Sequence, residues 1–165
     1  EIMPSLVGSE MCIRDRHTIS EFFYRTQHIQ QLGGYQIYPA GYYADDASIL
    51  LFCNNNGIAS TEESLIVYRK SENNISSSSC WNVEKSKAAL KYYQWIIDEF
   101  PMKQQDEQII QQRLDFDLYT YFSAALNIHQ SIQILNCIPV NIWNWKKKLL
   151  CLYKFILNSY AKQIK

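Results

Sequence analysis

Asp45 and Asp46 are the residues of this sequence whose types and spacing point most directly to chemistry. Apolar and aromatic residues flank the pair on both sides, which strengthens the repulsion between the two carboxylates. Mg²⁺ binds one or two carboxylates together with phosphate oxygens of a substrate. Two such ions stabilise the attacking and leaving oxygens of an in-line displacement. The pair therefore predicts a Mg²⁺ or Mn²⁺ site, although Asp is also a common turn residue and a solvated acidic turn needs no metal.

The elements expected to position this pair are two strands. Residues 35–44 and 47–53 are rich in aromatic and branched side chains, which is typical of strands. The two residues between them give the connection length of a tight β-hairpin, and Pro39 would place the first strand at an edge or bulge. We therefore expect an antiparallel hairpin with both Asp side chains at its tip.

Helices are expected over much of the remaining chain. Ser20 caps a first helix that runs to Leu32 and ends at the following two glycines. Apolar residues recur at helical spacing over 84–100, and Pro101 ends that helix. Further helices are expected over 105–114, 118–134 and 143–160. The last of these has an apolar side formed by Leu149, Leu150, Leu152, Tyr153 and Ile156, and its lysines 146–148 are expected to be solvated.

Two segments between these elements are less regular. Residues 60–68 fit a helix or a strand, and residues 72–79 are polar and rich in Ser, which predicts a loop. The predicted fold class is α+β: an antiparallel β-hairpin followed by a mostly helical segment, in an incomplete domain. The predicted division places the fragment that contains the hairpin at 17–100 and a helical segment at 101–165.

Composition bounds the class of protein. With 165 residues, 47% of them hydrophobic and 19% charged, the chain has enough apolar side chains to form a core. Its formal net charge of zero argues against a freestanding nucleic-acid binder, which usually has a basic face. No run of 18 apolar residues predicts a membrane span. The five cysteines lack metal-ligand spacing and favour free thiols in an intracellular, reducing compartment.

The first residues of the chain are set apart from this reasoning. Residues 4–16, PSLVGSEMCIRDR, resemble a peptide that recurs in conceptual translations of sequencing-adaptor DNA. We therefore expect residues 1–16 to be non-native and the native sequence to begin near His17, as a truncated fragment of a longer protein.

The segment YADDASILLFC at 43–53 resembles the catalytic hairpin of reverse transcriptases of non-LTR retrotransposons. In that family Tyr or Phe, Ala and two Asp precede a small residue and an apolar strand. A second element of the family, with Ser, Asn and Lys-Ser at fixed spacing, resembles Ser77, Asn82, Lys85 and Ser86. The resemblance implies that Asp45 and Asp46 hold the metal ions. It also implies that Lys85 lies near the incoming nucleotide and donates a proton to the leaving pyrophosphate.

By this resemblance the hairpin belongs to a palm-like subdomain, and residues 17–100 are a palm-like fragment. The chain is then a fragment of an RNA-directed DNA polymerase, whose partners are a nucleic acid template-primer and a dNTP. The family's upstream Gln-Gly motif and its earlier palm Asp are not present in the sequence. Because two-metal chemistry needs that third carboxylate, we expect the fragment to be inactive as it stands.

Two alternatives from other classes stay open. Residues 65–71, 93–95, 106–108 and 132–135 resemble, in order, segments of nucleotide-diphospho-sugar transferases. By that resemblance Asp106 would point to the acceptor or sugar, Asp45 and Asp46 would replace the metal-binding Asp-x-Asp, and a parallel sheet would bring the start of the Asp106 helix near Asp45. Such a protein would enter the secretory pathway, where Asn74 is a glycosylation acceptor. The other alternative is an unclassified helical interaction fragment.

Overall fold

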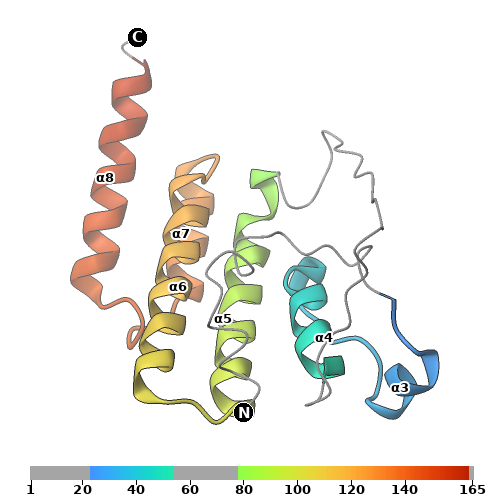
Figure 1. The fold of residues 1–165 in the computed structure, drawn as a ribbon. Helices are drawn as coiled ribbons and strands as arrows, with labels where there is room; N and C mark the ends of the chain where they lie inside the picture. Colours follow the sequence, from blue (N-terminus) through green and yellow to red (C-terminus); the bar gives the residue numbers. More distant parts are fainter. Residues whose placement is uncertain (1–22, 54–77, 164–165) are drawn as a thin grey trace, which may run out of the picture. The chain divides into compact units, whose positions relative to one another are not determined.

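The computed structural model describes residues 23–53 and 78–163, with side chains of the last helix described as far as residue 157 (Figure 1). All regular elements within these residues are helical, and they contain no strand. In chain order the elements are α3 Thr26–Gln31, η2 Pro39–Gly41, α4 Ala44–Cys53, η3 Ser79–Trp81, α5 Asn82–Glu99, α6 Gln104–Ser123, α7 Ile128–Cys137 and α8 Trp145–Gln163.

The described residues fall into two compact units. The first contains α3 and α4, and the second contains η2 and everything from η3 to α8. The division predicted at residue 100 stays a prediction. Within the second unit, α5 packs against the helices that follow it.

Phe52 is the centre of the first unit. Its ring lies edge-on to those of Tyr24 and Tyr35, with centroids 5.1 and 5.5 Å away. Its carbonyl oxygen lies 2.9 Å from Nε2 of His28 on α3, within hydrogen-bonding distance. α3 ends where the sequence predicts, because Gly33 and the next residue both adopt a positive φ.

The predicted hairpin is wrong, because residues 44–53 form helix α4. Ala40 and Tyr43 have φ angles of 54° and 65°, which breaks any extended run before the helix. The helix then buries Ala47, Ile49 and Phe52, a set that a strand would split between two faces. Branched and aromatic residues thus serve a helix here, since tertiary packing overrides their preference for strands. The fold class of the described residues is all-α.

The second unit is a group of packed helices. α5 contacts α6, α7 and η2, and α7 also contacts α6 and α8. Ala88 and Ala89 of α5 are completely buried, and these small side chains allow close approach of the neighbouring helices. Larger side chains that are equally buried come from α6, α7 and the segment before α8: Leu118, Ile134 and Trp143.

The boundaries of α5 confirm the sequence reasoning, whereas those of the next two helices correct it. α5 ends before Pro101, as expected. The predicted helices 105–114 and 118–134 are instead α6, which is continuous across their gap, and α7. Asn127 separates α6 from α7, because its side chain caps α7 by accepting a hydrogen bond of 2.9 Å from the backbone N–H of Gln130.

α8 forms as the sequence predicts, but its buried side differs. Lys148 is 8% exposed, which contradicts the expectation that lysines 146–148 are solvated. Cys151 is also buried, whereas Leu149, Leu150 and Tyr153 of the expected apolar side are exposed. None of the helices in the described part of the chain is long and apolar enough to cross a membrane. Residues 1–16, 60–68 and 72–77 lie outside the described residues.

Candidate functional site

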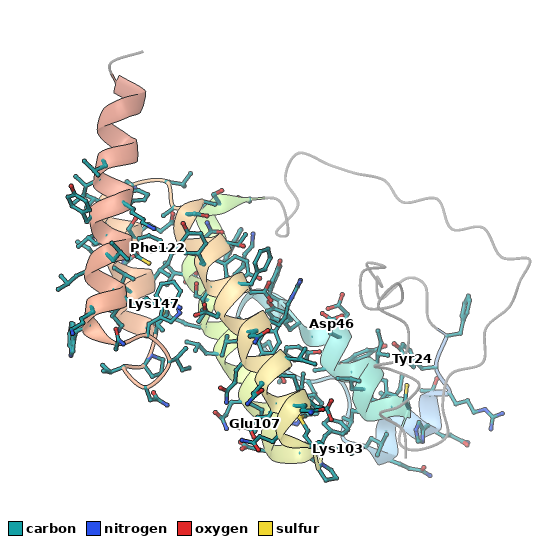
Figure 2. All side chains as sticks on the ribbon, turned by 60° about the vertical axis from the view of Figure 1, so that its left-hand side comes forward. Tyr24, Asp46, Lys103, Glu107, Phe122 and Lys147 are labelled. Atoms are coloured by element: carbon teal, nitrogen blue, oxygen red, sulfur yellow. The ribbon has the colours of Figure 1, made fainter. Side chains whose placement is uncertain are left out.

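Asp45 and Asp46 occupy the first turn of α4 rather than the tip of a hairpin. Figure 2 labels Asp46 on this helix. Consecutive helical residues diverge by about 100° around the axis, so the two side chains leave the helix in different directions. Negative charge in the first turn complements the positive end of the helix dipole. The pair is therefore explained by helix formation and does not need a cation to offset its repulsion.

The described residues contain no group of three or more His, Cys, Asp or Glu side chains that could hold a metal ion. A site for two metal ions needs more carboxylates than the pair on α4 supplies. The Mg²⁺ or Mn²⁺ site expected at Asp45 and Asp46 rests on sequence resemblance alone and is untested, because the hairpin geometry that motivated it is wrong.

Lys85, the third predicted site residue, is a buried amine of α5 that is 3% exposed. Its Nζ donates a hydrogen bond of 2.9 Å to the carbonyl oxygen of Ser78 and lies 5.4 Å from the centre of the Tyr42 ring. Burial lowers the pKa of this amine, while the nearby Cys80 thiol raises it. Lys85 belongs to the second unit and the Asp pair to the first, so their joint site stays a prediction.

Asp106, the residue singled out by the transferase resemblance, lies in the first turn of α6 beside Glu107. Its position has the same explanation as that of the pair on α4, namely negative charge near a helix N-terminus. The parallel sheet that the transferase interpretation predicts is absent from residues 23–53 and 78–163. Its geometric expectation is therefore wrong for the described part of the chain.

Two other carboxylates of α6 are held in hydrogen-bonded clusters that sequence reasoning did not find. Asp117 accepts a hydrogen bond of 2.6 Å from the Tyr93 hydroxyl, and its other oxygen lies 3.4 Å from Nε of Arg113. Burial, and then Asp117, raise the pKa of Tyr93. Asp115 accepts from Nε1 of Trp143 and pairs with Nζ of a lysine on α8. Both clusters join helices, which gives these acids a structural role.

A groove of about 510 Å³ lies along α5, α6 and the segment before α8. Amides dominate its polar lining, and its single charged group, Asp115, is already engaged by Trp143 and a lysine. Asp115 is therefore the one carboxylate among the lining residues, and its contacts with Trp143 and Lys147 hold it as part of the packing between helices. Its lining residues are Leu90, Gln94, Ile97, Gln108, Gln111, Gln112, Leu114, Asp115, Asn141 and Ile142.

The most unusual feature of the second unit is the solvent side of α8. Six large apolar side chains on this helix are between 38% and 66% exposed. Single exposed apolar side chains are ordinary on a protein surface, but several on one side of one helix are more often part of a contact surface. We call this set the α8 outer face, and it consists of Trp145, Leu149, Leu150, Tyr153, Ile156 and Leu157.

The opposite side of α8 is anchored to its neighbours. Phe155 packs edge-on against Phe122 of α6, with ring centroids 5.8 Å apart. Lys147 pairs with Asp115, and Figure 2 shows Phe122 and Lys147 where α8 meets the other helices. Lys148 donates hydrogen bonds to the carbonyl oxygens at the end of α7. The side of α8 that faces the second unit is therefore held by aromatic packing, an ion pair and hydrogen bonds, while the α8 outer face is left exposed.

The chain matches no family model, no curated protein and no solved structure. Among the described residues, the α8 outer face is the feature that points most clearly to a function.

Proposed function

We propose that this chain is a helical protein-interaction fragment whose α8 outer face docks an amphipathic helix of a partner. The observation that carries the proposal is the exposure of six large apolar side chains on one helix. Scattered exposed apolar residues are ordinary, but a contiguous apolar patch usually marks a contact surface. The proposal replaces catalysis as the best-supported function because no described constellation combines a nucleophile, a base and a binding pocket.

The spacing of the outer face fits recognition by another helix. Leu149, Tyr153 and Ile156 follow one another at intervals of four and three residues, and Leu150 and Leu157 are seven residues apart. Partner helices are recognised through anchors at i, i+3, i+4 and i+7, because these positions share one side of a helix. The same alternation of three and four residues forms the seam between paired helices.

The packing beneath the outer face supports docking at low entropic cost. Phe155 and Cys151 lie against the rest of the second unit, and Lys147 ties the first turns of α8 to Asp115. A surface that is already ordered loses less conformational entropy when a partner binds, so more of the contact energy contributes to affinity.

The test uses a designed probe, a fluorescein-labelled peptide of about 20 residues with Leu at the seam positions and Gln on either side. Fluorescence anisotropy measures its affinity for the full chain and for the double variant Leu149→Glu with Tyr153→Glu. We expect the double variant to bind at least about tenfold more weakly, because each lost anchor contributes about 1.5–3 kcal/mol on full burial.

A matched control places the same changes elsewhere. Ile109 and Tyr119 are exposed residues of α6, so Ile109→Glu with Tyr119→Glu adds the same charges to a different helix. Circular dichroism verifies that both double variants keep the helical content of the parent chain. The proposal fails if the peptide does not bind, or if the control weakens binding as much as the α8 variant does.

A further inference from the structure

We infer that the helix recognised by the α8 outer face is acidic, with carboxylates along one edge of its apolar seam, and belongs to another protein rather than to a second copy of this chain. This inference rests on the proposed docking function and names the partner class. It follows from which lysines of α8 have partners within the second unit and which are exposed.

α8 carries only positive charge. Its sequence contains five lysines and no Asp or Glu. Two of these lysines are engaged within the second unit: Lys147 pairs with Asp115, and Lys148 is buried against carbonyl oxygens of Leu135 and Ile138. Among the lysines of α8 whose side chains the structure describes, this leaves Lys146 and Lys154.

Lys146 and Lys154 are exposed, and within the described residues neither lies within 4 Å of an acidic oxygen. They precede and follow Leu150 by four residues each, so the three residues form one column along the helix. Eight residues of helix span about 12 Å. Two positive charges at this separation therefore lie in one column with Leu150 of the α8 outer face, and a partner helix with carboxylates seven or eight residues apart matches them.

A second copy of this chain fits poorly. A symmetric dimer places the same patch on both sides of the interface. Because α8 has no acidic residue, Lys146 and Lys154 would meet only apolar or positive groups of the other α8. Desolvating a lysine without a partner is unfavourable, so charge disfavours self-pairing.

An anionic lipid surface also fits less well than an acidic helix. Helices that lie in a membrane interface place lysines on the polar side, away from the apolar side that enters the lipid. On α8 the side opposite the outer face is packed against protein, and Lys146 lies in the same sector as Leu150 and Tyr153. Inserting the outer face into lipid would carry this ammonium with it.

The experiment compares three helical peptides with the same Leu seam, flanked by Glu, Gln or Lys. At about 50 mM salt, where exposed charges are weakly screened, we expect the Glu peptide to bind roughly fivefold more tightly than the Gln peptide. The Lys peptide binds more weakly than both. Raising the salt to about 0.5 M brings the three affinities together, because the added ions screen the exposed pairs.

The variant Lys146→Gln with Lys154→Gln separates charge recognition from docking. It should lose the preference for Glu and keep the affinity for the Gln peptide. Lys87→Gln with Lys103→Gln, which removes two exposed lysines elsewhere in the second unit, should keep the preference. Equal affinities for all three peptides would overturn the acidic class and leave the docking function standing, whereas failure of every peptide to bind would overturn both.

Two further outcomes bear on the occupant. Sedimentation equilibrium of the chain alone should give a monomer, and a dimer that the Leu149→Glu and Tyr153→Glu changes dissociate would assign the face to a second copy. Flotation with vesicles of phosphatidylcholine and phosphatidylserine should leave the chain unbound. Vesicle binding that is lost in Lys146→Gln with Lys154→Gln would overturn the inference in favour of a lipid surface.

Discussion

α5 and α8 are the two long helices whose sequence patterns are easiest to interpret, and they place their apolar residues in opposite ways. α5 turns Ala88, Ala89, Tyr93 and Ile96 inward. α8 buries the stem of Lys148 together with Cys151 and leaves leucines outside. The spacing of apolar residues identifies a helix. The neighbouring helices and the available hydrogen-bond acceptors decide which side of that helix is buried.

The difference matters because it assigns different roles to residues of the same type. An inward residue of α5 contributes to stability, and an outward leucine of α8 contributes to association. Lys148 of α8 is buried and therefore belongs with the residues that contribute to stability. Substitutions on the two helices therefore test the comparison directly.

The largest effect is expected inside α5. Ile96→Ala removes buried methyl groups and leaves a cavity, so we expect the free energy of unfolding to fall by about 2–5 kcal/mol. Urea denaturation followed by circular dichroism measures this change. Ile109→Ala, at a position on α6 that is 56% exposed, serves as the control and should have a much smaller effect. Similar losses in both variants would contradict the inward orientation of Ile96.

The next effect is expected at Lys148. Lys148→Ala removes the donor that satisfies two carbonyl oxygens at the end of α7, and we expect a loss of about 1–3 kcal/mol in the free energy of unfolding. Lys146→Ala, at an exposed position on the same helix, should change it little. If both variants unfold at the same urea concentration as the parent chain, the buried position assigned to Lys148 is wrong.

A smaller, pH-dependent effect is expected at Tyr93. Burial raises its pKa in the folded chain above the ordinary value of 10.0, and Asp117 adds to this. The unfolded chain therefore releases this proton first, so the stabilisation is complete below pH 10 and declines as the pH rises above it. Tyr93→Phe should make the free energy of unfolding, measured by urea denaturation at a series of pH values, less dependent on pH in the alkaline range.

The outer face of α8 should be nearly neutral for stability. Leu149→Gln exchanges one exposed side chain for another, so we expect the free energy of unfolding to change by no more than about 0.5 kcal/mol. The same variant should bind the peptide with the Leu seam more weakly than the parent chain does. A large loss of stability would show that Leu149 is packed in solution and would remove the contrast between the two helices.

No effect is expected for metal binding at α4. Asp45→Asn should leave the affinity for Mg²⁺ and Mn²⁺ unchanged in isothermal titration calorimetry, because the first turn of a helix explains the carboxylate. Weaker binding by the variant would restore the polymerase interpretation despite the absence of the hairpin.

The sequence predicts several of the helices but not which helices pack against one another. The 84–100 pattern identifies α5 because its apolar residues recur at helical spacing and Pro101 ends the run. α4 was missed because Ile49 and Phe52 favour strands in isolation, and an acidic pair fits a turn as well as a first helical turn. Only packing against Tyr24 and Tyr35 separates these cases, and those contacts are invisible to local patterns.

The candidate site was predicted even less well. Four of the six outer-face residues belong to the apolar side that the sequence predicts for this helix: Leu149, Leu150, Tyr153 and Ile156. That side is exposed instead of buried, because a long lysine side chain such as Lys148 also has an apolar stem that can be buried. The cluster of Asp115, Trp143 and Lys147 joins residues distant in sequence, and no spacing rule predicts it. The amide-lined groove is likewise a product of tertiary packing.

The buried ammonium of Lys148 has a consequence for how the C-terminal region opens. Its hydrogen bonds end on Leu135 and Ile138, the carbonyls that water would otherwise solvate where α7 stops. If α8 moved away, both carbonyl oxygens would lose their hydrogen-bond donor at once. Fraying at the start of α8 therefore also frays the end of α7. The last turn of α7 and the first of α8 therefore form a single cooperative corner, and their backbone amides should exchange with solvent at a common rate.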